Sequence, residues 1–161
     1  MINLKAEFYL KIIFLFSFIA LISAFFIEYI LGHQPCNLCL IERIPYGLSI
    51  MIIMAIFLIK KNQKFLVMLL ILTFIFSFAI SFYHFGIEQG FFQESSVCGV
   101  ESFTETITKE DLLKQLNEKI ISCKDVTFRI FGLSLTSINI VISLLFIITL
   151  LKIFKKYEKN K

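Results

Sequence analysis

Residues Phe65–Ile87 read FLVMLLILTFIFSFAISFYHFGI, a run of 23 residues without one charged side chain. An α-helix rises 1.5 Å per residue, so about 20 apolar residues cross the ~30 Å hydrocarbon core of a bilayer. A segment inside lipid must also satisfy its backbone hydrogen bonds internally, which a helix does. This run therefore predicts one membrane-spanning helix.

Three further runs have the same character: Ile12–Ile27 and Ile44–Ile59 have 16 uncharged residues each, and Ile130–Leu151 has 22. The 161-residue chain is 58% apolar and 17% charged, whereas soluble domains are roughly 45–50% apolar and about 25% charged. These values exclude a nucleic-acid-binding domain and almost any soluble enzyme. We predict a single-domain (1–161), all-α membrane protein, a four-transmembrane-helix bundle in contact with lipid. The expected helices cover about 10–31, 40–59, 65–87 and 130–151.

The charged residues orient this bundle. Residues 60–64 contain three lysines, residues 152–161 contain five lysines and one acid, and residues 1–11 have a net charge of +1. Residues 86–129 contain eight acids and five bases. Because short cytoplasmic segments are rich in lysine and arginine, both termini (1–9 and 152–161) and the 60–64 loop are expected in the cytoplasm. The loops 32–39 and 88–129 are then expected on the outer side.

The four cysteines all fall in these two outer loops, as a Cys36-x-x-Cys39 pair and as Cys98 and Cys123. An even number of thiols on the oxidising side suggests two disulfides. A C-x-x-C disulfide closes too small a ring to stabilise much chain, so it favours a redox role. The pair also lies at the amino end of the second predicted helix, where the helix dipole stabilises a thiolate. Arg43, one turn later, would add positive charge.

Other functions remain open from the residues alone. The cysteines could form two structural disulfides in a non-catalytic scaffold, or a zinc site of four cysteines. A small membrane cytochrome is a further alternative, with His33 and His84 as axial haem ligands near the outer surface. A c-type haem site is excluded, because Leu40 follows Cys39 where a histidine would be required.

The long outer loop has its own helical pattern. Thr108 is a candidate cap, and apolar residues recur at helical spacing through Ile121. We predict a short amphipathic helix on the membrane surface between Cys98 and Cys123.

Several stretches together resemble the disulfide bond formation protein B (DsbB) family. They are QPCNLCLIERIPYG at residues 34–47, Tyr83-His84, GIEQG at residues 86–90, the two loop cysteines, and FRIFGLSL at residues 128–135. The resemblance covers nearly the whole chain in order. Asn37, between the paired cysteines, departs from the small or apolar residue expected there.

The resemblance implies an enzyme of the bacterial inner membrane, a quinone-dependent thiol oxidase. Its partner would be a periplasmic thioredoxin-fold dithiol oxidase (DsbA-like), which attacks a Cys98–Cys123 disulfide at Cys98. Cys123 would then exchange with Cys36, and the long loop would have to move to bring them together, because exchange requires direct sulfur contact. Cys39 would pass electrons to ubiquinone or menaquinone. Arg43 matches the quinone-interacting arginine, and His84 is a further candidate for quinone contact.

Overall fold

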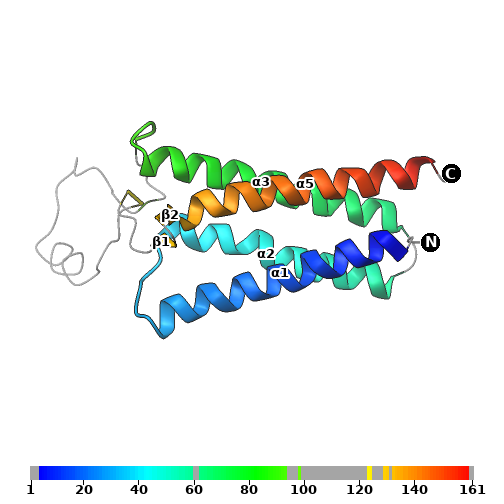
Figure 1. Ribbon diagram of the computed structural model, residues 1–161, viewed down its shortest axis with the longest axis horizontal. Helices are drawn as coiled ribbons and strands as arrows, with labels where there is room; N and C mark the ends of the chain where they lie inside the picture. Colours follow the sequence, from blue (N-terminus) through cyan, green and yellow to red (C-terminus); the bar gives the residue numbers. More distant parts are fainter. Residues whose placement is uncertain are drawn as a thin grey trace, which may run out of the picture.

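The computed structural model describes residues 4–59, 62–93, 98, 123–124, 129–130 and 132–159. Most of these residues belong to four long helices, α1 (Leu4–Tyr29), α2 (Asn37–Leu58), α3 (Gln63–Glu88) and α5 (Leu135–Lys159). The helices lie side by side with both chain termini at one end of the bundle (Figure 1). The predicted all-α, four-helix membrane architecture is confirmed.

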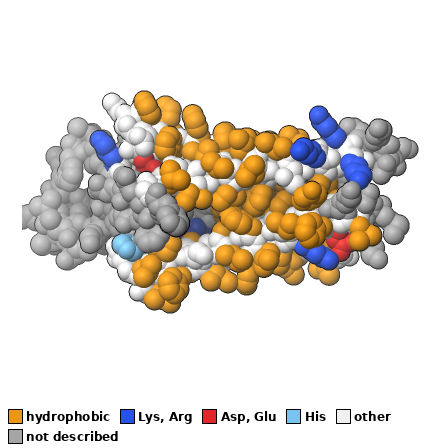
Figure 2. Space-filling model, in the orientation of Figure 1, with side chains coloured by type: hydrophobic (Ala, Val, Ile, Leu, Met, Phe, Trp, Pro, Cys, Tyr) orange, Lys and Arg blue, Asp and Glu red, His pale blue; other side chains and the backbone are white. Residues whose placement is uncertain are grey.

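Each of these helices is long and apolar enough to cross a membrane, over Ala6–Tyr29, Asn37–Leu58, Gln63–Glu88 and Leu135–Lys156. Large apolar side chains point outward along their length. Figure 2 shows hydrophobic side chains covering the middle of the visible face, with lysine and arginine nearer its ends. Because such a surface is stable only in lipid, the chain is a multi-pass membrane protein.

The interior of the bundle is filled by apolar side chains from all four helices. Leu10 of α1, Ile53 of α2, Phe74 of α3 and Leu150 of α5 are fully buried in one cluster. Helix α3 packs against both α2 and α5, whereas α1 packs mainly on α2. Phe74 contacts the edge of the Phe146 ring at a centroid distance of 5.0 Å, which joins α3 to α5.

Small hydroxyl side chains mark the closest helix contacts. The Oγ atoms of Ser49 and Ser17 are 3.0 Å apart between α2 and α1, and those of Ser77 and Ser143 are 3.1 Å apart between α3 and α5. All four residues are buried. Small polar residues let helix backbones approach closely and hydrogen-bond within lipid. These pairs therefore fix the helix spacing that positions the end of the bundle.

The fourth helix begins later than predicted. We expected it from about residue 130, but Arg129–Ile130 (β1) and Leu133–Ser134 (β2) form a short antiparallel hairpin instead. Gly132 has a φ of +82°, a left-handed conformation that glycine adopts without a steric penalty. This turn interrupts the apolar run, and α5 starts at Leu135.

The start of α2 also differs from the prediction, and the difference affects the position of the cysteines. Helix α2 starts at Asn37 rather than at Leu40, because the Cys36 side chain caps it. Cys39 therefore lies inside its first turn.

The amphipathic helix predicted between Thr108 and Ile121 lies outside the described residues.

Candidate active site

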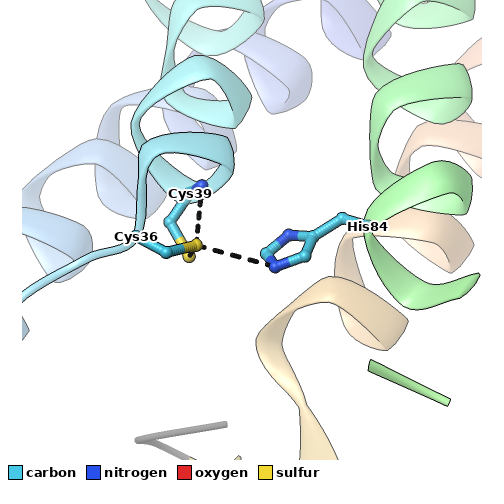
Figure 3. A group of neighbouring side chains, drawn as sticks. All are labelled: Cys36, Cys39 and His84. Atoms are coloured by element: carbon cyan, nitrogen blue, oxygen red, sulfur yellow. Dashed lines mark hydrogen bonds between the residues drawn. The ribbon is translucent and has the colours of Figure 1, made fainter. Parts of the chain in front are cut away.

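The Cys36-x-x-Cys39 pair is built by the amino end of α2. Cys36 is the cap residue, with extended backbone angles (φ −72°, ψ 167°), and its Sγ accepts the Cys39 backbone N–H at 3.3 Å. The two sulfurs are 2.8 Å apart, and both cysteines are free thiols (Figure 3). A sulfur at this position receives hydrogen bonds and the positive end of the helix dipole, as the sequence predicted.

His84, near the carboxyl end of α3, faces the pair from across the bundle. Its ring is only 2% exposed, and its Nε2 lies 3.7 Å from the Sγ of Cys36 (Figure 3). Its Nδ1 lies 2.9 Å from Oε1 of Glu42. Because a carboxylate only accepts, the Nδ1 of His84 donates to Glu42, and Nε2 remains to interact with the thiol.

Cys36 carries the acidic thiol of the pair. A hydrogen bond from the Cys39 side chain lowers the pKa of Cys36 from 9.0 to about 4, and bonds from His84 and the Cys39 backbone act in the same direction. Burial opposes them by disfavouring the charged form. A thiolate is the reactive form in disulfide exchange, so Cys36 is prepared as a nucleophile or as a leaving group.

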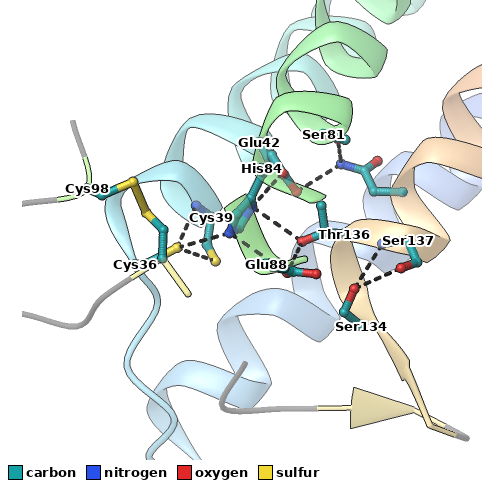
Figure 4. Close-up of polar contacts among 12 residues, drawn as sticks. Cys36, Cys39, Glu42, Ser81, His84, Glu88, Cys98, Ser134, Thr136 and Ser137 are labelled. Carbon is teal, nitrogen blue, oxygen red and sulfur yellow. Dashed lines mark hydrogen bonds and ion pairs between the residues drawn. A yellow bond between two sulfur atoms is a disulfide. The ribbon is translucent and has the colours of Figure 1, made fainter. Parts of the chain in front are cut away.

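Behind His84, a polar network joins three helices inside the apolar bundle (Figure 4). Asn139 of α5 donates from Nδ2 to Oε2 of Glu42 at 3.1 Å and to Ser81 at 2.7 Å. The Tyr46 hydroxyl donates to Oδ1 of the same asparagine. Asn139 is 8% exposed, so these bonds are shielded from water and hold the Glu42 carboxylate in one position.

A second carboxylate, Glu88, lies one turn after His84 on α3. Its Oε1 accepts a hydrogen bond from Thr136 Oγ1 at 2.7 Å and lies 3.9 Å from Nε2 of His84. Its Oε2 is buried, and it has no hydrogen-bond partner among the described residues. Buried carboxylates near the end of a membrane span are costly, and they usually mark functional sites.

The guanidinium of Arg43 contacts residues of α1. It pairs with Glu28 of α1 and lies over the Phe25 ring at 5.3 Å from the centroid. Glu42, the adjacent acid on the same helix, instead binds His84. The Arg43 and Glu28 side chains are 17% and 20% exposed, so this ion pair is largely shielded from solvent.

Cys98 and Cys123 form a disulfide with a Cα–Cα distance of 5.6 Å, a normal spacing for such a bond. Both belong with Cys36 to a buried cluster that also contains Leu38 and Ile87, and we call it the cysteine cluster. We expected the loop to have to move to bring Cys123 to Cys36. The structure places the disulfide in the same buried cluster as Cys36 (Figure 4), and movement of the loop stays a prediction.

The open alternatives can be compared with this geometry. The loop disulfide leaves Cys98 and Cys123 without thiolates, so a zinc site of four cysteines is not formed. As a haem ligand, His84 would have to use Nε2, because Nδ1 contacts Glu42, and Nε2 instead faces the buried sulfur of Cys36 at 3.7 Å. His33, the other haem candidate, lies in the α1–α2 connection, where its backbone N–H bonds to Ile27. The smaller set Cys36, Cys39 and His84 places three metal-binding atoms within 4.8 Å of one another.

Sequence reasoning identified the cysteines, Arg43 and His84, but it missed most of the supporting polar residues. Glu42 and Glu88 were detectable as acids at the ends of apolar runs, which is unusual in membrane helices. Asn139 was detectable as the single amide of the fourth run. No local spacing connects these residues, because they lie on different helices.

Two comparisons place the chain among known proteins. The family described as Disulfide bond formation protein DsbB matches residues 6–153. An uncharacterized protein of Rickettsia prowazekii (strain Madrid E) is 31% identical over 147 residues, which cover 90% of this chain and 86% of that protein. The family match includes α2, α3, most of α1 and α5, and all four cysteines, and the chain therefore belongs to the disulfide bond formation protein DsbB family.

Proposed function

We propose that this protein oxidises a reduced thioredoxin-fold (DsbA-like) dithiol protein in the periplasm and passes the electrons to a quinone of the bacterial inner membrane. Membership of the DsbB family supports a membrane thiol oxidase that serves disulfide formation. The observation that carries the finer proposal is the cysteine cluster, in which Cys36 and the Cys98–Cys123 disulfide are buried together. A dithiol, Cys36/Cys39, next to the Cys98–Cys123 disulfide would form a short route for electrons.

The proposed orientation follows from charge. Both termini lie at the end of the bundle opposite the start of α2 (Figure 1), where Cys36 and Cys39 lie. Exposed Lys152, Lys155 and Lys156 lie on the last turns of α5 near the termini. Because lysine-rich ends stay in the cytoplasm, the cysteine end would face the periplasm. There the thiols would meet oxidised and reduced partner proteins.

Thiol exchange would proceed in balanced steps. A partner thiolate attacks Cys98, which breaks the Cys98–Cys123 bond and leaves Cys123 as a thiolate; the second partner thiol then releases Cys98. Cys123 attacks the oxidised Cys36–Cys39 pair at Cys36, and Cys39 leaves as a thiolate. Cys98 then attacks Cys123, which restores the loop disulfide and releases Cys36. The partner has become a disulfide, and its two electrons reside in the Cys36/Cys39 dithiol.

The residues around Cys36 would control its proton. Nε2 of His84, 3.7 Å from Sγ of Cys36, accepts the thiol proton, while Glu42 stabilises the charged ring through Nδ1. Asn139 keeps the Glu42 carboxylate in place for this purpose. His84 thereby acts on the thiol, and we assign it this role rather than quinone contact.

Arg43 and Cys39 are the residues that would hold a quinone. Arg43 offers a partly exposed cation, and Cys39 offers a partly exposed sulfur one turn earlier on α2. This donor set fits a ring whose oxygens gain negative charge. When bound, a quinone supplies a two-electron, two-proton acceptor that becomes a quinol.

The proposal is tested by mixing the purified protein with a reduced thioredoxin-fold dithiol oxidase and following quinone absorbance. We expect one quinone reduced for each partner disulfide formed, and no reduction with Cys36→Ala. A matched control is Leu40→Ala, because this side chain is 43% exposed on the same turn of α2. Absence of quinone reduction, or full activity of Cys36→Ala, would overturn the proposal.

A further inference from the structure

The reduced Cys36/Cys39 pair forms part of a cluster that has the composition of a metal site. The two sulfurs and Nε2 of His84 lie within 4.8 Å of one another, and they converge from α2 and α3 (Figure 3). We infer that the reduced protein binds one thiophilic divalent cation through Cys36, Cys39 and His84. Glu88, whose Oε1 lies 3.9 Å from Nε2 of His84 but outside this group of three atoms, would have to turn toward the sulfurs to become the fourth ligand. Occupancy would block thiol exchange, so the site would act as a reversible, metal-dependent stop.

The histidine is already oriented as a metal ligand. Glu42 accepts from Nδ1 of His84 at 2.9 Å, which leaves Nε2 on the side of the sulfurs. Metal-binding histidines almost always donate their other ring N–H to a carboxylate, a carbonyl or water, and this contact fixes the ring and increases its basicity. Asn139 in turn holds Glu42 at 3.1 Å, so the supporting contacts exist before an ion arrives.

Glu88 provides the independent observation that points to a ligand. Its side chain is 6% exposed, its Oε1 lies 3.9 Å from Nε2 of His84, and its buried Oε2 has no partner among the described residues. An unpaired buried carboxylate oxygen is costly, because it loses water without gaining a donor. A cation bound beside His84 would remove this cost, and the carboxylate would complete a four-ligand site.

The distances agree with tetrahedral coordination after a small adjustment. With zinc–sulfur and zinc–nitrogen bonds of about 2.3 and 2.0 Å, ligand atoms in a tetrahedral site are about 3.5–3.8 Å apart. Cys36 Sγ and His84 Nε2 already have a separation of 3.7 Å. The sulfurs are 2.8 Å apart, so they must separate by about 1 Å.

The donor set also selects the class of ion. Two thiolates, one imidazole and one carboxylate suit Zn²⁺, Cd²⁺ or Co²⁺, whereas Mg²⁺ and Ca²⁺ prefer oxygen ligands. Binding displaces the thiol protons, because only thiolates coordinate the ion. A Cys36–Cys39 disulfide offers no thiolate, so the site exists only in the reduced protein. The inference does not depend on quinone or on a partner protein.

Cobalt is a suitable probe, because thiolate-bound Co²⁺ has charge-transfer and visible bands that report sulfur ligands and tetrahedral geometry. The test uses the full chain in detergent with Cys98→Ser and Cys123→Ser, so that only Cys36 and Cys39 supply thiols. We expect the reduced protein to bind one Co²⁺ with the tetrahedral spectrum, and Zn²⁺ to displace it. The same sample after oxidation to the Cys36–Cys39 disulfide should lose the spectrum, a comparison that needs no further variant.

Three substitutions test two of the ligands and the carboxylate that supports His84. Cys39→Ser should remove about half of the charge-transfer intensity, and Glu42→Gln should weaken Co²⁺ binding about 10- to 100-fold. Glu88→Gln should weaken it at least about 10-fold and alter the visible bands. The matched control is Glu7→Gln, which changes an exposed carboxylate of α1 that pairs with Lys11, and it should leave binding unchanged.

The outcomes separate this inference from the proposed function. Absence of Co²⁺ binding by the reduced protein, or binding that persists in the disulfide form, would overturn the metal site. Unchanged binding by Glu88→Gln would overturn the assignment of the fourth ligand. Cobalt binding without any thiol oxidase activity would support the metal site and contradict the proposed function. In an active preparation, Zn²⁺ should stop turnover and a chelator should restore it.

Discussion

The Nδ1 atom of His84 lies 2.9 Å from Oε1 of Glu42, although the two residues are 42 positions apart and lie on different helices. This contact determines which ring nitrogen faces Cys36. The first turns of α2 thus supply both the reactive thiol and the carboxylate that orients its base. The last turns of α3 supply the His84 ring, which lies between the Cys36 thiol and the Glu42 carboxylate.

Glu42→Gln should slow thiol oxidation roughly 10- to 100-fold, because glutamine keeps the shape of the side chain but cannot stabilise a positively charged His84 ring. Glu42 acts through His84, so the variant should also shift the pH dependence of Cys36 alkylation to higher pH. Both properties can be measured on one preparation, with Glu7→Gln as the control for loss of a carboxylate. An unchanged alkylation profile would show that the carboxylate does not support the thiolate.

Cys36 should react as a thiolate well below neutral pH. Its pKa is lowered to about 4, so its alkylation rate should stay constant from about pH 8 to about pH 5, whereas an ordinary thiol slows tenfold per pH unit below its pKa. The folded-state pKa lies below the unfolded value of 9.0. The reduced protein should therefore gain stability as pH rises from about 4 to about 9 and lose it in the reverse direction.

Fragment-ion mass spectrometry after brief iodoacetamide treatment measures this profile, because it separates alkylation at Cys36 from alkylation at Cys39 on the same peptide. Cys39→Ala supplies the internal comparison, because the Cys39 hydrogen bond is the largest cause of the lowered pKa. In this variant the midpoint of the profile should move toward 9.0. A wild-type rate that falls tenfold per unit from pH 8 downward would contradict the prediction.

The four helices and the position of the cysteine pair could be predicted from the sequence, because both depend on local properties. A run such as Phe65–Ile87 has no other stable form in lipid, and a C-x-x-C motif before a helix places its first sulfur at the cap. The start of α5 was predicted too early, because hydropathy does not detect the turn at Gly132.

The contacts that complete the site depend on helix packing, which no spacing rule provides. Arg43 could pair with Glu42 on its own helix or with an acid on another helix, and only the approach of α1 makes Glu28 its partner. The spacing also left the partner of Cys98 undetermined. The resemblance to the DsbB family supplied that pairing, and the structure contains it.

Arg43→Lys should raise the KM for quinone more than it lowers kcat. Lysine retains the positive charge, but it loses the planar group that pairs with Glu28 and lies over the Phe25 ring. Cys36 alkylation should be unaffected, because its pKa depends on Cys39 and His84. Steady-state kinetics with varied quinone separates the two parameters. A fall in kcat with KM unchanged would argue that Arg43 has no part in holding the quinone.

Asn139→Leu should destabilise the bundle by about 2–3 kcal/mol, because it leaves the Tyr46 hydroxyl, Ser81 and one oxygen of Glu42 without their buried partner. Tyr46→Phe removes one donor and leaves the other bonds of Asn139 intact, so it should cost only about 1 kcal/mol. Unfolding in mixed micelles with increasing sodium dodecyl sulfate measures both values.

If the network also orients His84, the Asn139→Leu protein should oxidise thiols more slowly under conditions in which that variant remains folded. Tyr46→Phe should have little effect on the rate. Equal losses of stability and activity in the two variants would mean that the network only holds the helices together and does not act through Glu42 on the thiol.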